Sequence, residues 1–257
     1  MASPKHTLLV TGAAGGIGTG FVYEFLKTPQ ASTHHALYII HPSQPGTLAH
    51  LLSTRAPPSH TYEILPLDLS SLSAIYSFTS SINKRVEAGD LPPLRALFLI
   101  AGGIFTAKDA ADGIDYSADG MEKMFAVNYL ANFVLVLRLL GCMGEAGRVV
   151  FMSSSTHWPE HRSNAGHVRR EEHRVVWREV DVLARGKQEA VGGSKKERFE
   201  AAMRRYGTSK TLMNLWMYVP FSLFPLRQTS MGRSQRHLGT SSKTASQQIP
   251  SSPTSPF

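Results

Sequence analysis

Residues that build disulfides and metal sites are scarce in this chain. Its 257 residues include one cysteine, Cys142, which excludes an internal disulfide and any zinc site made of several cysteines. Four histidines fall between residues 157 and 173, but no HExxH pattern accompanies them. We therefore expect no bound metal. A single cysteine fits a reducing compartment, so we also expect a cytoplasmic protein.

Long apolar runs and, toward the C-terminus, acidic residues are also few. The start of the chain has too short an apolar run for a signal peptide and no stretch approaches membrane-spanning length, so we expect no membrane partner. The net charge of +8 divides into −2 for residues 1–147, +6 for 148–210 and +4 for 211–257, which hold no acid. Because no motif of interleaved aromatic and basic residues accompanies the basic regions, we expect no nucleic-acid partner.

Apolar segments alternate with longer amphipathic segments along the first 150 residues or so. This alternation is typical of β–α–β units and predicts an α/β fold around a parallel sheet. A turn rich in Pro, Ser and Gly is predicted after the second strand. The predicted strands are Thr7–Val10, Ala36–Ile40, Tyr62–Leu67, Leu94–Ile100 and Arg148–Met152, and the predicted helices are Gly16–Lys27, Leu72–Val86 and Gly120–Leu140.

The composition changes after Ser155. Residues 157–195 are rich in Arg, Glu and His with little apolar periodicity, which predicts a basic insert on the surface. A helical pattern returns over 195–218, and Pro220 and Pro225 would end a helix there. Ser, Thr, Gln and Pro then dominate, so we predict a folded domain of residues 1–218 and an irregular, disordered tail of residues 219–257.

A glycine-rich turn, Thr11-Gly12-Ala13-Ala14-Gly15-Gly16-Ile17-Gly18, follows the first predicted strand directly. Between a strand and a helix, such a turn lets the backbone approach a pyrophosphate, whose charge the helix N-terminus attracts. A side chain at Gly12, Gly16 or Gly18 would clash with the nucleotide or with the packing of the turn. The turn therefore predicts a dinucleotide-binding domain.

Further residues, in order along the chain, make this pattern specific. With the TGxxxGxG turn they resemble the motifs of the short-chain dehydrogenase/reductase family, in particular its retinol-dehydrogenase-like and fungal metabolite branches. The resemblance implies a Rossmann-type three-layer sandwich. The matching residues are Asp68 and Leu69 after the third strand, Ala101 and Gly102 after the fourth, then Asn128, Ser154 in a run of three serines, and Tyr206 with Lys210.

A tyrosine followed four residues later by a lysine is a weak signal alone, because Tyr23 and Lys27 make the same pair. No serine motif precedes that pair, and we interpret it as packing and a solvated amine. Tyr206 and Lys210, in contrast, follow Ser154 and lie on one helix face, where they can act together.

The resemblance assigns a catalytic role to four residues, Asn128, Ser154, Tyr206 and Lys210. A phenol has an ordinary pKa of about 10, and the ammonium of Lys210 would lower that of Tyr206. Tyr206 would then transfer a proton to a carbonyl oxygen, to which Ser154 donates a hydrogen bond. Lys210 would also hold the nicotinamide ribose, and Asn128 a water that links Lys210 to solvent.

The resemblance also predicts the cofactor site and its ligand. Relatives that use NAD carry an acid at the end of the second strand, where this chain has Ile40-His41-Pro42-Ser43. His41 and Ser43 would tolerate a 2′-phosphate, so we expect NADP in preference to NAD, although no Arg or Lys stands there. The predicted cofactor-binding residues are Gly12, Gly16, Ile17, Gly18, His41, Asp68, Leu69, Ala101, Gly102, Asn128, Tyr206 and Lys210.

The chain also departs from the family pattern. Leu99 and Ile100 stand where the family has two asparagines, and Ser154 and Tyr206 are 52 positions apart, farther than is usual. The resemblance ends at residue 218, so we expect a C-terminal truncation that removes the last strands and exposes an edge of the sheet. An exposed edge favours aggregation, whereas family members often form homodimers through the helices of Asn128 and Tyr206.

Three hypotheses about function follow. The first is an NAD(P)H-dependent oxidoreductase that interconverts a carbonyl and an alcohol of a small molecule, in secondary metabolism. The alternative is a non-catalytic or inactive truncated dinucleotide-binding protein. The third is an interaction protein that uses the basic insert and tail on acidic partners, with binding that depends strongly on salt.

Overall fold

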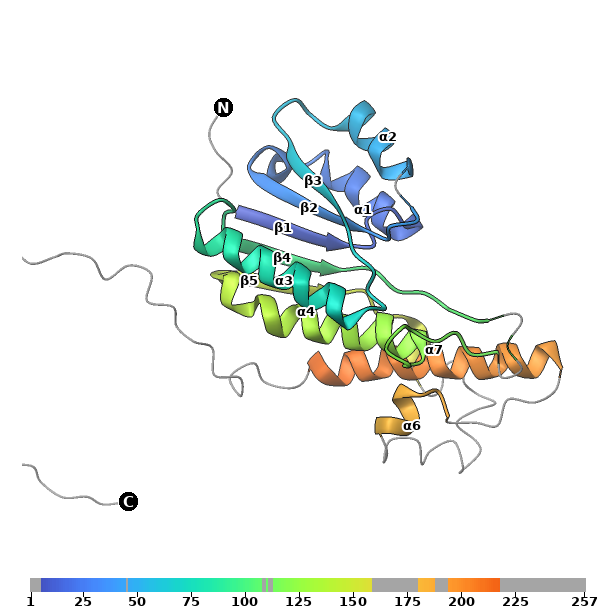
Figure 1. Ribbon diagram of the computed structural model, residues 1–257. Coiled ribbons are helices and arrows are strands. Elements are labelled where there is room, and N and C mark those ends of the chain that lie inside the picture. Colours follow the sequence, from blue (N-terminus) through green and yellow to red (C-terminus); the bar gives the residue numbers. More distant parts are fainter. Residues whose placement is uncertain are drawn as a thin grey trace, which may run out of the picture. The chain divides into compact units, whose positions relative to one another are not determined.

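Five parallel strands form the centre of the computed structural model (Figure 1). The structure describes residues 6–44, 46–107, 110, 113–158, 180–187 and 194–217. The predicted tail and most of the predicted insert lie outside these residues. The strands in chain order are β1 (His6–Thr11), β2 (His34–Ile40), β3 (Thr61–Pro66), β4 (Leu94–Leu99) and β5 (Met143–Phe151).

The order of the strands across the sheet is β3-β2-β1-β4-β5, and every neighbouring pair is parallel. Leu9 in β1 is paired with Leu37 in β2 on one side and with Leu97 in β4 on the other. The chain therefore reverses its direction of travel across the sheet between β3 and β4. Ligands of open α/β sheets bind beyond the carboxyl ends of the strands at such a reversal point. The predicted α/β fold with a parallel sheet is confirmed.

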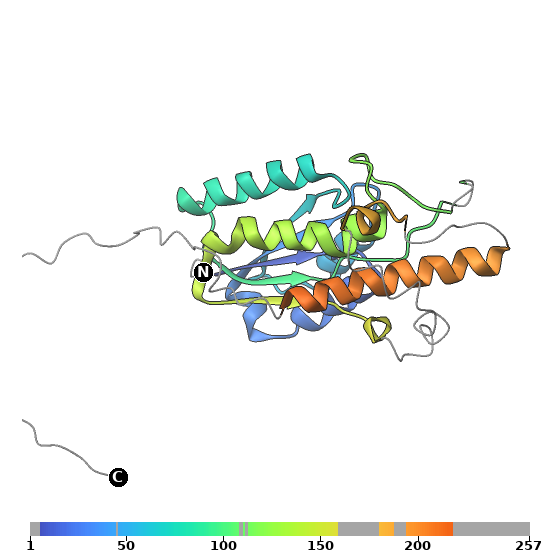
Figure 2. The same ribbon diagram turned by 90° about the horizontal axis from the view of Figure 1, so that it is seen from below.

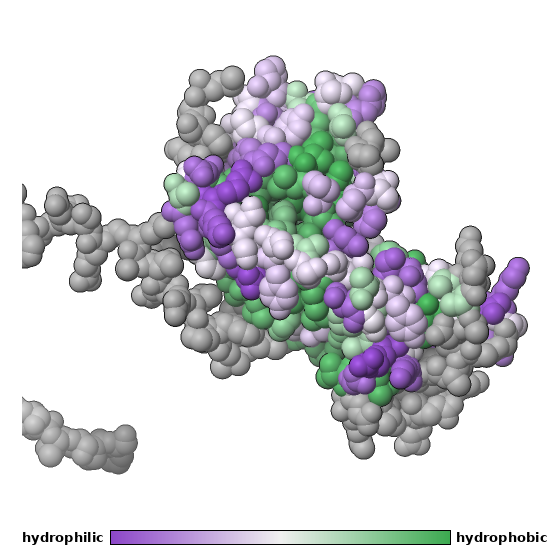
Figure 3. Space-filling model, viewed as in Figure 1, coloured by the Kyte–Doolittle hydropathy of each residue, from purple (hydrophilic) through white to green (hydrophobic). Residues whose placement is uncertain are grey.

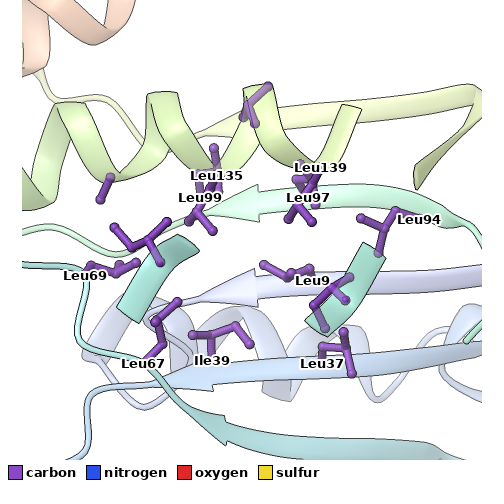
Figure 4. Close-up of a cluster of buried hydrophobic side chains, with 14 of the residues drawn as sticks. Leu9, Leu37, Ile39, Leu67, Leu69, Leu94, Leu97, Leu99, Leu135 and Leu139 are labelled. Carbon is purple, nitrogen blue, oxygen red and sulfur yellow. The ribbon is translucent and has the colours of Figure 1, made fainter. Parts of the chain in front are cut away.

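Alternate residues of β1, β2, β3 and β4 face opposite layers of helices, so the domain has three layers (Figure 2). One core lies between the sheet and the helices α3 (Leu72–Glu87) and α4 (Ala131–Leu139). Each fully buried leucine of this core contributes about 1.5–3 kcal/mol to folding. Its leucines come from four strands or strand ends and from α4, and Figure 4 shows Leu9, Leu37, Ile39, Leu67, Leu69, Leu94, Leu97, Leu99, Leu135 and Leu139.

The second core lies on the other face of the sheet, under α1 (Gly16–Phe25) and α2 (Gly46–Arg55). Helix α2 replaces part of the turn that the sequence predicts after β2. Its Leu48 and Leu52 are buried and four residues apart, so they share one helix face. Because prolines flank this segment, the sequence predicted a turn and not a helix from the two leucines. On the face in Figure 3, hydrophilic residues flank a central band of hydrophobic ones.

The predicted helix Gly120–Leu140 begins later than expected. Gly120 has φ +73° and closes a turn onto Ser117, so the helix starts only after it. The segment Phe125–Leu130 (η2) is a π-helix that continues into α4 and then into the short 3-10 helix η3 (Leu140–Cys142).

The span Phe125–Cys142 corrects one expectation. Over these 18 residues the mean hydropathy is 1.7, so among the described residues one helix is long and apolar enough to cross a membrane. The sequence prediction that no stretch approaches that length was wrong. More than half of the span, 56%, is buried inside the structure. Packing of α4 against the sheet accounts for its apolar character.

Strand β5 begins at Met143, five residues before the predicted strand, and pairs with β4. Beyond it come the 3-10 helix η4 (Ser155–His157), α6 (Val180–Ala184) and α7 (Lys195–Met217), which matches the predicted helical segment. Helix α6 falls within the predicted surface insert, and its Leu183 is buried, with 2% of its surface exposed. This part of the insert therefore packs against the domain.

Candidate active site

The glycine-rich turn is shaped by close contacts between backbone atoms. Gly12 has φ +67°, and a Cβ there would lie 2.8 Å from the Cα of Ala101, which follows β4. A Cβ on Gly18 would lie 2.0 Å from the carbonyl oxygen of Gly12. Both predicted glycines therefore serve the packing of the turn, against β4 and against α1.

Gly16 differs from these two glycines because a Cβ there would meet no atom within 4 Å. It begins α1, and the N-cap residue Gly15 makes no side-chain hydrogen bond to the helix. The first N–H groups of α1 therefore keep their capacity to donate to an anion. Space beside Gly16 and a helix N-terminus without a side-chain cap fit the pyrophosphate of a dinucleotide.

A cavity of about 620 Å³ opens beside this turn, at the carboxyl ends of the central strands. Cavities of about 300–1,000 Å³ are typical of small-molecule and cofactor sites. Eight of the predicted cofactor residues line this one: Gly12, Gly16, Ile17, Gly18, His41, Leu69, Ala101 and Gly102.

Two polar side chains meet where β2 and β3 end. Nδ1 of His41 accepts the backbone N–H of Ser43 at 3.2 Å, which places the proton of the neutral ring on Nε2. Nε2 lies 4.0 Å from a carboxylate oxygen of Asp68. Partial burial opposes ionisation of Asp68, but hydrogen bonds from the hydroxyl and N–H of Ser70 hold its pKa below the ordinary value. Asp68 thus stays ionised at neutral pH.

Lys123 lines the same cavity and was not predicted from the sequence. Its ammonium lies 3.1 Å from the carboxylate of Asp115 and 5.7 Å from the centre of the Phe105 ring, which also lines the cavity. In the sequence, its position five residues before Asn128 was the one indication that Lys123 could lie near the site. The cavity wall therefore carries a cation besides the apolar residues.

Asn128 lies in η2 and is completely buried. Its Oδ1 accepts the N–H of Gly103 at 2.9 Å, and its Nδ2 donates to the carbonyl of Gly103 and to the hydroxyl of Ser209, each at 3.0 Å. In the widened helix the N–H of Ala131 bonds five residues back, to Ala126. Nδ2 of Asn132 donates to the carbonyl of Asn128 at 2.9 Å, so this carbonyl keeps a partner.

Lys210 lies in α7, and only 3% of its surface is exposed. Its ammonium donates to the carbonyl of Met152, the residue after β5, at 2.9 Å. Burial lowers the pKa of Lys210 to about 8. A lysine with this pKa can both hold and release a proton near neutral pH.

Tyr206 is half-buried on α7, with the ammonium of Lys210 5.7 Å from the centre of its ring. Ser154 caps η4, and its hydroxyl oxygen accepts from the N–H and hydroxyl of Thr156. In the described part of the chain no hydrogen bond joins Ser154 to Tyr206. The hydroxyl of Ser153, next to Ser154, is buried without a hydrogen-bond partner among the described residues.

The cavity and the buried lysine meet at Gly102. A Cβ on Gly102 would lie 2.9 Å from Oδ1 of Asn128 and 3.1 Å from Nζ of Lys210. The structure thus brings Asn128 and Lys210 to the edge of the cavity. The described lining of the cavity includes neither these two residues nor Ser154, Tyr206 and Asp68. Within the described residues, no group of three or more His, Cys, Asp or Glu could hold a metal.

The sequence of the chain is similar to those of known dehydrogenases. Residues 6–162 match the family model of the short chain dehydrogenases. The chain is 35% identical over 158 residues to the short-chain dehydrogenase iccH of Talaromyces variabilis, a match that covers 60% of this chain and 42% of that protein. A polyprenol dehydrogenase of Danio rerio is 29% identical over 156 residues, 58% of this chain and 44% of that protein. The chain spans less than half the length of these relatives.

Solved structures share the fold. A short chain dehydrogenase of Burkholderia cenocepacia in complex with NADP aligns with a TM-score of 0.52 at 17% identity, over 83% of this chain and 66% of that one. A carbonyl reductase of Pseudomonas aeruginosa aligns with a TM-score of 0.52 at 20% identity, over 86% of this chain and 78% of the other. The predicted Rossmann-type three-layer sandwich is confirmed.

Proposed function

The chain belongs to the short chain dehydrogenase family, and from this premise we propose that it is an NADP(H)-dependent oxidoreductase. It would interconvert a carbonyl and an alcohol on a small or medium-sized apolar molecule. One observation carries the proposal. The residue that ends the cofactor cavity, Gly102, has room for no side chain because Asn128 and Lys210 lie directly behind it.

The cofactor would lie in the cavity with its pyrophosphate at the N-terminus of α1, beside Gly16. His41 and Ser43 would face the adenosine ribose, since both line the cavity. We propose NADP in preference to NAD because β2 ends without an acid that would repel a 2′-phosphate. The bound nicotinamide would supply or accept the hydride.

Residues of the chain would transfer the proton that the carbonyl oxygen needs during reduction. Tyr206 would protonate the carbonyl oxygen during reduction, and Ser154 would donate a hydrogen bond to that oxygen. Lys210, still protonated below a pKa of about 8, would stabilise the phenolate that Tyr206 leaves behind. Asn128 would hold a water that returns a proton to Lys210. A place in secondary metabolism, a homodimer and a cytoplasmic location stay predictions.

A second candidate function is nucleotide binding without turnover. It is favoured by the positions of Ser154 and Tyr206, which do not line the cavity and share no hydrogen bond in the described structure. Under this alternative the cavity binds the cofactor, and no carbonyl compound is reduced.

Fluorescence titration with NADPH and NADH tests the proposal, followed by a screen of carbonyl substrates. Gly16→Asp places a negative charge at the helix N-terminus and should weaken NADPH binding at least about tenfold. Gly20→Asp is the matched control, because Gly20 is exposed on the same helix and does not line the cavity. Saturable binding that prefers NADPH, with turnover in the screen, supports the oxidoreductase.

Two other results would change the conclusion. Binding of NADPH without turnover on any carbonyl in the screen would favour the non-catalytic alternative. No binding of either nucleotide to a protein shown to be folded would contradict both.

A further inference from the structure

A buried ion pair joins the two helical segments that carry the catalytic candidates. Glu122 lies three residues before η2, and Arg205 lies in α7 immediately before Tyr206. Nε of Arg205 is 3.7 Å from Oε1 of Glu122, and the two side chains are only 3% and 2% exposed. The chemistry proposed above gives neither residue a role.

Glu122 is held from three directions. Its Oε2 accepts the N–H of Phe125, the first residue of η2, at 2.7 Å. Its own N–H donates to the carbonyl of Ala184 in α6 at 2.7 Å. Gly186 approaches so closely that a Cβ there would lie 2.8 Å from Cγ of Glu122. These contacts hold Glu122 between the start of η2, α6 and Gly186.

Two charges at such a place are costly. Burial and, less strongly, the charge of Asp115 raise the pKa of Glu122, while the N–H groups of Phe125 and Met124 and the charge of Arg205 oppose that rise. A buried ion pair is often no more stabilising than apolar residues of the same volume, whereas loss of one partner leaves an unpaired charge. Stability is thus a weak reason for this pair. Fixing the register of packed helices is the better-attested role of buried polar groups.

Among the described residues, the pair is one of three polar side-chain contacts that join these helices at successive levels. On α7 the contacts fall at every fourth residue, so they lie on one helix face. The ion pair is the only one of the three between charged groups. The contacts are Arg205 with Glu122 at 3.7 Å, Ser209 with Asn128 at 3.0 Å and Met213 with Asn132 at 3.9 Å.

We propose that Glu122 and Arg205 are positioning residues that set the register of α7 against η2, and thereby place Tyr206 and Lys210 beside Asn128. The inference rests on the proposed function for its kinetic consequence. Its structural consequence, the burial of Lys210, does not depend on that function.

The kinetic test uses Glu122→Gln, Arg205→Met, the double variant and the conservative Arg205→Lys. A shift of the catalytic groups by a fraction of an ångström should lower kcat about tenfold or more in Arg205→Met. The KM for NADPH should change less than about twofold, since the cofactor cavity does not include either residue. Arg205→Lys keeps the charge and should recover most of kcat. The double variant should be better folded than Arg205→Met, because no unpaired carboxylate remains.

The structural test measures the pH dependence of chemical labelling of the Lys210 amine, followed by mass spectrometry. The labelling midpoint of the wild type should lie at about 8. In Arg205→Met it should rise toward the ordinary lysine value of 10.5, because the amine gains solvent when α7 loses its register. This readout needs neither cofactor nor turnover.

Glu63→Gln is the matched control. Glu63 forms an ion pair with Arg85 at 2.6 Å on the opposite part of the domain, and it is no part of the site. It should lower thermal stability without moving kcat or the labelling midpoint. A wild-type protein with neither binding nor turnover would refute the proposed function, and the labelling midpoints would still decide on the pair. Folded Arg205→Met and double variants with wild-type midpoints would overturn the inference, as would a kcat loss equal to that of Glu63→Gln.

Discussion

The candidate cofactor cavity and the face of α7 that carries the catalytic candidates are positioned by different kinds of contact. Around the cavity, backbone atoms touch backbone atoms, and the contacts of Gly12 and Gly18 lie within the turn or reach one neighbouring strand. On α7, side chains make the contacts, and Ser209 and Lys210 reach partners 81 and 58 residues away. At Gly12 and Gly18 the close backbone contacts leave no space for any side chain larger than that of glycine. On α7, a substituted residue that offers the same polar group could keep the contact. The two regions should therefore fail in different ways when they are changed.

The largest effect separates catalysis from binding. Tyr206→Phe removes the proton donor and should lower turnover about 10²–10⁴-fold, while the Kd for NADPH changes little. Steady-state kinetics and fluorescence titration measure the two quantities. The control is Tyr23→Phe, because Tyr23 has a lysine four residues later and carries the ammonium of Lys27 3.9 Å above its ring. Equal losses of turnover in both variants would contradict the assignment.

The next effect separates packing from binding inside the turn. Gly18→Ala places a methyl group 2.0 Å from a backbone oxygen, so the turn must shift. We expect a loss of about 1–3 kcal/mol in the free energy of unfolding. Gly16→Ala should leave that free energy unchanged or higher, since its Cβ meets no atom, and should weaken NADPH binding instead. Urea denaturation and titration would show a reversed pattern if Gly16 were the packing residue.

The smallest expected effect is a loss of stability at low pH that is caused by the burial of His60. His60 is buried just before β3, next to Phe25 of α1, with Nδ1 2.7 Å from the carbonyl of Ala31 and Nε2 3.1 Å from the hydroxyl of Tyr38. Burial lowers the pKa of His60 below 6.5, so the folded protein binds its proton less readily than the unfolded chain. The stabilisation is complete above pH 6.5 and is lost as the pH falls below that value.

We expect the free energy of unfolding to fall further in the wild type than in His60→Gln between pH 7.5 and 5.5 in urea denaturation. His50→Gln, at an exposed position of α2, should follow the wild type. Identical pH dependence in all three proteins would place the acid sensitivity outside this region.

This contrast also explains what the sequence could predict. The glycine turn and all five strands follow from local pattern, because each needs only its neighbours in the chain, although β5 begins five residues before the predicted strand. Helix α2 was not predicted, because two leucines between prolines are too few to show the periodicity of a helix. The ion pair of Glu122 and Arg205 and the wall position of Lys123 could not be read locally, because they depend on how α7 and the loop before η2 pack. Asn128 and Lys210 were found only through the family resemblance.

The distance in sequence between Lys210 and Met152 has a consequence in time. A chain leaves the ribosome from its N-terminus, and all five strands are complete at Phe151, before α7 begins at Lys195. The residues that line the candidate nucleotide cavity are therefore made before Lys210, which arrives with α7. A nucleotide that binds the early cavity stabilises it by mass action. The cofactor would then act first as an aid to assembly and only later as a reactant.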